Sequence, residues 1–371
     1  MVLKAEHRRW LLELTALPTA AGYEGAVAAW VRRWVMQRPW ARIRTDGAGN
    51  LVLLRRGVRS RRPVVLAAHM DHPALVVKRV GTGRGTQKVW AEFRGGVRRE
   101  FFTAARVRLV HEGSPDRRGR VQEYRPAGGG LKRPVVVVEL AGEGPAAAGD
   151  IVRWDLPPTR VRGRRLAAPA CDDLAGVAAA LAAWDALAGS RKAKFRGDVR
   201  VLLTRAEEVG FIGAIAACQR GTIPAGARVI ALENSKALAD APLGAGPVVR
   251  VGDKTSSFDP GLTYRCAQVA AKLAARDKRF KWQRKLMPGG TCEASAYQSY
   301  GYTATCLCLP LENYHNMDEK SGRIASEVID LGDFAGLVRL LVAVSRSVSH
   351  GREPGLKERL EGIFEQGRGV L

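Results

Sequence analysis

The stretch Thr204-Arg205-Ala206-Glu207-Glu208-Val209-Gly210 places two adjacent carboxylates between an apolar run and a glycine-marked turn. Residues 198–203 before it have the length and the valine and leucine content of a buried strand, and residues 210–217 indicate the start of a helix. Open α/β sheets bind ligands at the carboxyl ends of their strands. Adjacent side chains point in different directions, so one carboxylate could bind a metal while the other moves a proton. An isolated Glu-Glu pair is about ten times more often an ordinary charged loop, so other ligand-type residues must recur in the same position.

Such residues do recur at the ends of other predicted strands. Two histidines and several carboxylates at one edge of a sheet suit a pair of Zn2+ or similar ions, with one carboxylate bridging them. Two ions would polarise a scissile carbonyl and lower the pKa of a water, while a carboxylate that is not a ligand would transfer its proton. The residues are His69 after residues 63–68, Glu233 after residues 227–232, His315 beyond residues 303–310, and Asp172 at the turn before a helix over residues 174–187.

Each of these residues also has a purely structural alternative. A lone histidine more often packs or caps, Asp172 could cap the helix that follows it, and Glu233 could pair with an arginine. Taken singly, each ligand role has roughly one chance in five. Their joint recurrence at strand ends favours the metal site.

The composition is that of a globular protein. At 371 residues with 46% apolar content, the chain is long enough for two or three domains. No apolar run approaches the ~18 residues of a membrane span, and the first 14 residues interleave charge at helical spacing. Six cysteines are too sparse for a disulfide scaffold. We therefore expect a cytoplasmic protein with reduced thiols, without a signal peptide or a membrane anchor.

The net charge of +24 and the sequence pI near 10.5 raise the question of a polyanionic partner. The basic residues are scattered, and their densest clusters (residues 117–120, 160–165 and 278–285) are brief. No nucleic-acid-binding motif accompanies them. A solvated basic surface is about three times more frequent than a dedicated site, so we expect no nucleic-acid partner.

The pattern of the chain changes between residues 74 and 164, where short alternating runs separated by glycines predict a small β-barrel or sandwich. Residues 1–73 and 165–371 on either side have an α/β pattern. We therefore predict an α/β protein with a mixed central sheet flanked by helices, interrupted by an inserted β domain. We also expect amphipathic helices over residues 5–15, 24–37 and 326–348 and an exposed loop over residues 117–134.

Nine motifs give the sequence a family resemblance. It resembles the dinuclear metal aminopeptidases that assemble as hollow tetrahedral dodecamers, which include glutamyl and deblocking aminopeptidases and belong to the co-catalytic zinc exopeptidase clan. The motifs stand in the family's order over nearly the whole chain, and a β domain inserted between the His-x-Asp and Asp-Asp motifs is also similar to that family. They are LPTAAGYEG (17–25), DGAGNLV (46–52), AAHMDH (67–72), ACDDLAG (170–176), RAEEVGFIGA (205–214), ALENSKA (231–237), LGAGPVVRVGD (243–253), GGTCEASAY (289–297) and CLPLENYHN (308–316).

The resemblance implies a complete active site with two divalent ions, Zn2+ first and Co2+ or Mn2+ as alternatives. It also implies a fold like that of the zinc exopeptidases and a homo-oligomer, with a dodecamer as the family's form. The implied metal ligands are Asp172 as the bridge, His69 and Glu233 on one ion, and Glu208 and His315 on the other. The other implied roles are general base for Glu207, orientation of His69 for Asp71, and lining of the substrate cleft for Gly290 and Thr291.

Four positions depart from the pattern of the family. Glu233 and Cys292 stand where aspartate is usual, His72 where an acidic residue is usual, and Leu174 where arginine or lysine is usual. Glu233 keeps a ligand oxygen on a longer side chain. Cys292 and His72 lie close to the predicted cleft, so the departures bear on substrate preference more than on the chemistry. For a lone cysteine such as Cys292, an inert role is roughly four times as frequent as a reactive one.

We therefore predict a metal-dependent aminopeptidase that acts on short peptides, in which the inserted domain serves assembly or substrate access. One alternative is a deacylase of N-acyl amino acids that uses the same metals, and activity profiling would separate the two. A second alternative is a non-catalytic basic binding protein on this fold. Against it stands the presence of every implied ligand together with Glu207.

Overall fold

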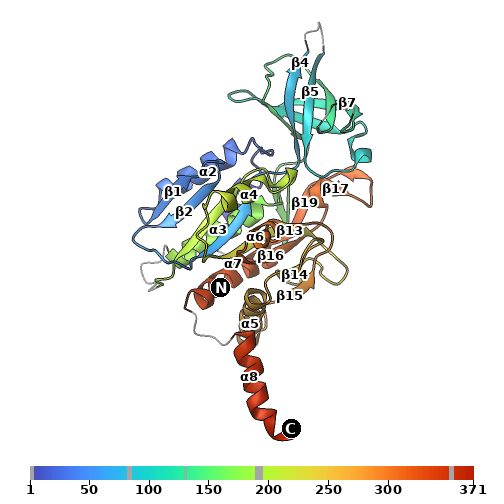
Figure 1. Ribbon diagram of the computed structural model, residues 1–371. Coiled ribbons are helices and arrows are strands. Elements are labelled where there is room, and N and C mark those ends of the chain that lie inside the picture. Colours follow the sequence, from blue (N-terminus) through green and yellow to red (C-terminus); the bar gives the residue numbers. More distant parts are fainter. Residues whose placement is uncertain (1–3, 82–85, 129, 131, 189–194, 351–354) are drawn as a thin grey trace.

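The computed structural model describes the whole chain except residues 1–3, 82–85, 129, 131, 189–194 and 351–354. An α/β body built on an eight-stranded mixed sheet carries a closed six-stranded barrel, which stands apart from it (Figure 1). This arrangement confirms the predicted fold class. Within the described residues, no helix combines the length and the apolar character needed to cross a membrane.

The order of strands in the central sheet explains why residues far apart in sequence can meet. The four central strands β12, β3, β13 and β16 are mutually parallel, so their carboxyl ends lie at one edge, while the outer pairs β2·β12 and β14·β16 are antiparallel. In spatial order the strands are β1 (Ala41–Thr45), β2 (Leu51–Arg55), β12 (Val199–Thr204), β3 (Val64–His69), β13 (Arg228–Lys236), β16 (Thr303–Leu311), β14 (Val248–Gly252) and β15 (Gln283–Leu286).

Helices cover both faces of this sheet, which is why its central strands carry runs of consecutive apolar residues rather than an alternating pattern. In β3, Val64, Leu66 and Ala68 belong to one buried cluster, and Val65 and Ala67 to the other. The first cluster includes side chains of α1 (Ala5–Leu14), α2 (Gly25–Met36), α3 (Leu174–Ala188), α5 (Pro260–Arg276) and α7 (Leu331–His350), and the second those of α4 (Ile212–Gln219) and α6 (Glu293–Ser299).

The barrel lies within the predicted insertion. Its core is formed by inward side chains such as Val89, Phe102, Val107 and Val138, with the short helix η1 (Arg99–Phe102) at one end. The strands follow in the order β4 (Ala74–Val80), β5 (Gln87–Arg94), β8 (Val135–Leu140), β7 (Arg117–Arg125), β6 (Arg106–Val110) and β9 (Ile151–Trp154).

The expected loop over residues 117–134 is wrong for its first part, because residues 117–125 form β7. The sequence of this strand is polar because most of its side chains point outward into solvent, while Val121 faces the barrel core.

A second, three-stranded sheet joins the segment that follows the barrel to the segment before α7. It consists of β10 (Arg160–Arg162), β11 (Arg165–Ala168) and β19 (Glu327–Asp330), all antiparallel. The helix that we expected over residues 326–348 therefore begins too early, because residues 327–330 pair with β11 and α7 starts at Leu331. A β-strand pairing with a distant segment leaves no local signal in such a short run. The hairpin β17 (Met317–Asp318) and β18 (Arg323–Ile324) precedes β19.

The described C-terminal residues form α8 (Leu356–Gly367) and η4 (Arg368–Val370). Helix α8 extends from the body near α5, with no buried residue (Figure 1). Arg359 donates a hydrogen bond to the hydroxyl of Tyr264 in α5 at 2.8 Å. All six cysteines are free and buried, as expected for a chain that does not rely on disulfides.

Candidate metal centre

The predicted ligands converge because all of them except Asp172 lie in, or shortly after, one of the four parallel strands. His69 is the last residue of β3, and Glu207 and Glu208 open the short helix η2 (Glu207–Val209) after β12. Glu233 lies in β13, and His315 lies in η3 (Tyr314–Asn316) beyond β16. Asp172 reaches the same edge from the turn before α3. The parallel pairing of the strands thus brings these side chains together at one edge of the sheet.

Asp172 lies at the centre of this cluster. Its Oδ1 is 3.4 Å from Nε2 of His69, and its Oδ2 is 3.5 Å from Nε2 of His315. Glu233 Oε2 is 4.0 Å from the His69 nitrogen, and Glu208 Oε1 is 3.3 Å from the His315 nitrogen. Two groups that could each hold one ion, His69-Asp172-Glu233 and Asp172-Glu208-His315, therefore share Asp172. The ligands implied by the resemblance thus fall into two candidate groups with Asp172 in common.

The buried oxygens of this cluster fit a cation. Oδ1 of Asp172 and one Oε1 each of Glu208 and Glu233 are buried without a hydrogen-bond partner. A buried carboxylate oxygen that binds nothing is costly, and a divalent ion would satisfy several at once. Oxygen and imidazole donors suit Zn2+ and also Co2+ or Mn2+.

The electrostatics of the cluster lead to the same conclusion. Burial is the main cause that raises the pKa of the Glu207 and Glu233 carboxyls well above their ordinary values. Burial alone would also raise the pKa of Asp172, but the nearby ring nitrogens of His315 and His69 hold it below its ordinary value. The site concentrates negative charge out of water, and a bound cation would stabilise the charged carboxylates.

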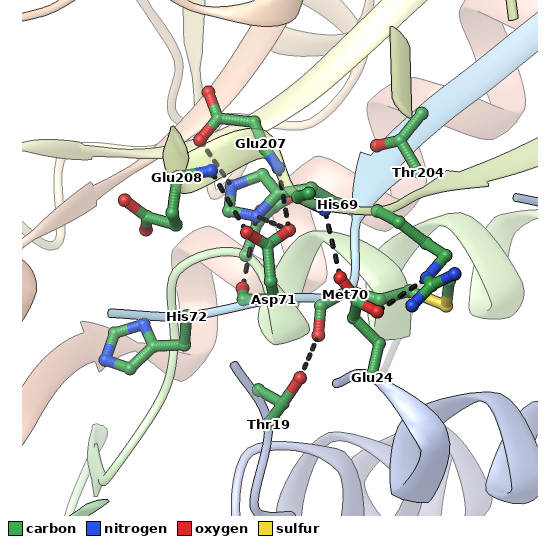
Figure 2. Close-up of polar contacts among 12 residues, drawn as sticks. Thr19, Glu24, His69, Met70, Asp71, His72, Thr204, Glu207 and Glu208 are labelled. Carbon is green, nitrogen blue, oxygen red and sulfur yellow. Dashed lines mark hydrogen bonds and ion pairs between the residues drawn. The ribbon is translucent and has the colours of Figure 1, made fainter. Parts of the chain in front are cut away.

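Asp71 is connected to both His69 and the η2 loop (Figure 2). Its carboxylate oxygens accept hydrogen bonds from the amides of Glu207 and Glu208, each at 3.0 Å. Nδ1 of His69 lies 3.2 Å from the backbone carbonyl of Asp71 and 3.6 Å from its carboxylate. Through these two amide hydrogen bonds Asp71 holds the turn that carries both glutamates, while its contact with the His69 ring is made chiefly by the backbone carbonyl.

The ring of His315 is oriented by the inserted domain. Its Nδ1 lies 2.8 Å from the carbonyl oxygen of Gly96, which follows β5. If Nδ1 carries the proton and donates it to this carbonyl, Nε2 is left free to bind an ion. A residue of the predicted insertion thus touches a predicted ligand.

Glu24 and Glu327 are buried carboxylates of this region that the sequence patterns did not single out. Glu24 accepts hydrogen bonds from the amides of Gly22 at 2.6 Å and Ala206 at 3.0 Å, and from Nε of Arg205 at 2.6 Å, which holds the approach to η2 (Figure 2). Its place in the LPTAAGYEG motif was the available signal. The second, Glu327, lies in the segment that we expected to be helical.

A cavity of about 70 Å3 adjoins the cluster on the side of Glu233. Gly290 and Thr291 line it, together with Tyr314 and Arg250. Arg250 is only 3% exposed, and its Nη1 donates to Oγ of Ser235 at 3.1 Å, while its Nε has no partner. A larger hollow of about 640 Å3 lies on the barrel, and none of the predicted site residues lines it.

Three of the residues that depart from the family pattern, Cys292, Leu174 and His72, lie in different surroundings. Cys292 is buried at the N-cap of α6, and its amide donates to Asp253 Oδ2 at 2.9 Å. Leu174 is fully buried in the apolar core. His72 lies behind the cluster, with Nδ1 2.6 Å from the backbone oxygen of Asp172 and Nε2 2.9 Å from Oδ1 of Asn316. Neither His72 nor Leu174 lines the cavity beside Glu233.

Comparison with known proteins adds a family and a fold. The family model described as M42 glutamyl aminopeptidase matches residues 143–340. The TET1 peptidase of Pyrococcus horikoshii, which can assemble into a tetrahedron or a large octahedral shell, is 22% identical, with 91% of this chain and 99% of that chain covered at a TM-score of 0.74.

Two other solved structures have the same fold. An aminopeptidase from the archaeon Desulfurococcus kamchatkensis is 22% identical (92% and 95% covered, TM-score 0.73). A TET aminopeptidase from a marine sediment Thaumarchaeota archaeon is 18% identical (96% and 98% covered, TM-score 0.75). No curated protein matches the chain.

Proposed function

The chain belongs to the M42 glutamyl aminopeptidase family, and from that premise we propose that it removes N-terminal residues from short peptides with two divalent ions and Glu207 as general base. Membership of this family makes it a metal-dependent aminopeptidase. The observation that carries the finer proposal is the carboxylate of Asp172, shared by two groups of potential ligands.

The proposed ligands divide into two sets around Asp172. His69 and Glu233 would hold one ion, and Glu208 and His315 the other. When bound, the ions would polarise the scissile carbonyl and lower the pKa of a water. Asp71 would keep His69 and the η2 turn in place through the three contacts described above.

Glu207 is suited to proton transfer. Its Oε2 lies 4.0 Å from Nε2 of His69, so it stands beside the proposed ligands. Burial raises the pKa of its carboxyl, which favours a base that can take a proton from water and pass it to the leaving amine. The amide hydrogen bond to Asp71 fixes its backbone.

Arg250 supports a preference for an acidic N-terminal residue. Its guanidinium is buried beside the cavity, and the hydrogen bonds found for it among the described residues go to the Ser235 hydroxyl and the Met287 carbonyl rather than to a carboxylate. A guanidinium pairs with a carboxylate through two parallel hydrogen bonds. A glutamyl or aspartyl side chain entering the cavity would supply that carboxylate, in keeping with the description of the family.

We also propose that the chain forms a homo-oligomer and that the inserted domain of residues 74–164 contributes to its assembly or to substrate access. The fold match to the TET1 peptidase, which assembles into closed shells, supports this proposal. Measurement of mass in solution by light scattering would test it, and a monomer at micromolar concentration would contradict it.

The experiment that tests the activity combines metal analysis with a substrate panel. We expect hydrolysis of glutamyl and aspartyl anilides with a free amine, loss of activity on chelation, and recovery on addition of Zn2+, Co2+ or Mn2+. Activity only on N-acylated substrates would replace the proposal with the deacylase. Absence of bound metal and of turnover would favour the non-catalytic binding protein.

A further inference from the structure

We propose that Glu327 is a positioning residue for the metal centre, which holds the shared ligand Asp172 and the ligand His315 in register with each other. The inference rests on the proposed ligands. Glu327 lies in β19, is fully buried, and belongs to none of the groups that could hold an ion. Its role is therefore exerted through the backbone of the ligands.

One carboxylate joins the two loops that carry these ligands. Oε2 of Glu327 accepts hydrogen bonds from the amides of Cys171 at 2.7 Å and Asp172 at 3.0 Å. Its Oε1 accepts from the amide of His315 at 2.9 Å. The turn before α3 and the helix η3 come from distant parts of the sequence, so this side chain sets the distance between their backbones.

The conformation of the η3 loop explains why it needs such a restraint. Asn313, His315 and Asn316 have φ values of 56°, 55° and 62°, in the left-handed region. For residues other than glycine this conformation costs roughly 1–2 kcal/mol each and persists only where surrounding contacts hold it. The amide of His315 is the one that Glu327 binds, so the carboxylate stabilises the strained residue that is itself a predicted ligand.

His72 forms a second connection between the same two loops. Its ring lies between the carbonyl of Asp172 and Oδ1 of Asn316, at 2.6 and 2.9 Å. Asn316 in turn donates to the carbonyls of Pro169 and Ala325, which fixes the orientation of its amide. Removal of Glu327 would leave this second connection in place, so we expect a displaced His315 rather than a collapsed site.

The substitution E327Q removes part of the hydrogen-bond accepting capacity of the side chain and keeps its size. Glutamine has the same shape, but its NH2 group cannot accept a hydrogen bond, so it cannot serve all three amides. Loss of a residue that orients a metal ligand typically costs about 10- to 100-fold in metal affinity. E327D keeps the charge at a shorter reach and should retain part of the affinity.

Asp333 provides a matched control. It is 1% exposed, and its two oxygens accept from the amides of Gly244 at 2.7 Å and Gly246 at 2.8 Å. It therefore resembles Glu327 in burial and in binding backbone amides, but it contacts no predicted ligand. D333N should reduce stability as E327Q does and leave metal binding unchanged.

The test is titration of metal-stripped protein with Co2+ in competition with a chelator, with the absorption spectrum of the bound Co2+ as a second readout. We expect E327Q to bind one of the two ions about 10- to 100-fold more weakly with an altered spectrum, and D333N to match the wild type.

Wild-type affinity and spectrum in E327Q would overturn the inference about Glu327 and leave the proposed function standing. A wild-type protein that binds no ion would overturn the proposed function and this inference with it. If E327Q does not fold, the same titration is made with E327D. The shorter aspartate cannot bridge both loops as Glu327 does, so wild-type metal affinity in E327D would contradict the inference.

Discussion

The metal-binding edge of the central sheet and the outer face of the barrel both carry many charged residues, but in opposite surroundings. At the edge, Asp172 and Glu233 are buried and leave oxygens without a partner. On the barrel, Arg125 pairs with Glu123 on the surface of β7, where both side chains are about half exposed. Buried charge without a partner indicates a ligand, whereas exposed paired charge mainly keeps the surface in water. The following predictions test this contrast, beginning with the largest expected effect.

Removal of the proposed base should have the largest effect. We expect E207Q to retain two ions and to lower kcat by at least about 100-fold, because glutamine cannot accept the proton from water. Metal analysis and steady-state kinetics on a glutamyl anilide measure both quantities. D333N, a buried carboxyl variant outside the site, serves as the control. An E207Q protein with normal turnover would remove Glu207 from the role of base.

The buried guanidinium beside the cavity should determine substrate choice. We expect R250Q to lower kcat/KM for a glutamyl anilide by about 10- to 100-fold and to leave a leucyl anilide nearly unaffected, because a charged hydrogen-bonded pair is lost. K236Q is the matched control, since Lys236 lines the same cavity but pairs with Glu319 at 2.6 Å. Equal losses on both substrates would show that Arg250 supports the fold rather than the preference.

A pH effect on stability should be detectable at Asp333. Burial raises the pKa of this carboxyl to about 6, so the folded state binds its proton more tightly than the unfolded state. The stability that this proton contributes is fully present below pH 4 and is lost as the pH rises through 6. Between pH 4.5 and 7.5, the wild type should therefore lose on the order of 2 kcal/mol relative to D333N in urea unfolding. Parallel curves for the two proteins would contradict the raised pKa.

The barrel surface should give the smallest effect. We expect R125Q to leave the urea midpoint of unfolding nearly unchanged, because an exposed ion pair contributes little to stability. Metal content and kcat should stay at the wild-type values. A large loss of activity would mean that this face of the barrel contributes to the site and would remove the contrast drawn above.

The convergence of candidate ligands at one edge of the sheet and the β structure after residue 74 could be predicted from the sequence for physical reasons that can be named. His69, Glu233 and His315 stand at strand ends, and parallel neighbours bring strand ends together. The short alternating runs after residue 74 have the period of strands, and the structure closes them into a barrel.

Most of the contacts that hold the ligands in place could not be predicted in this way. Glu327 acts through a strand whose partner, β11, is remote in sequence, and its local pattern suggested a helix. The contact of His315 with the Gly96 carbonyl joins two parts of the chain that no periodicity connects. Asp71 and Glu24 accept hydrogen bonds from backbone amides. Every residue except proline has such an amide, so the residue types of the donors do not reveal these bonds. Such contacts depend on tertiary geometry, which local patterns do not encode.

The most direct test of the account is the number of metal ions per chain in the wild type and in H315A, measured by native mass spectrometry after exchange into Zn2+. The account predicts two ions for the wild type and weakened binding of one in H315A, because His315 belongs only to the group formed with Asp172 and Glu208. Two tightly bound ions in H315A, or a single ion in the wild type, would contradict the bridged pair.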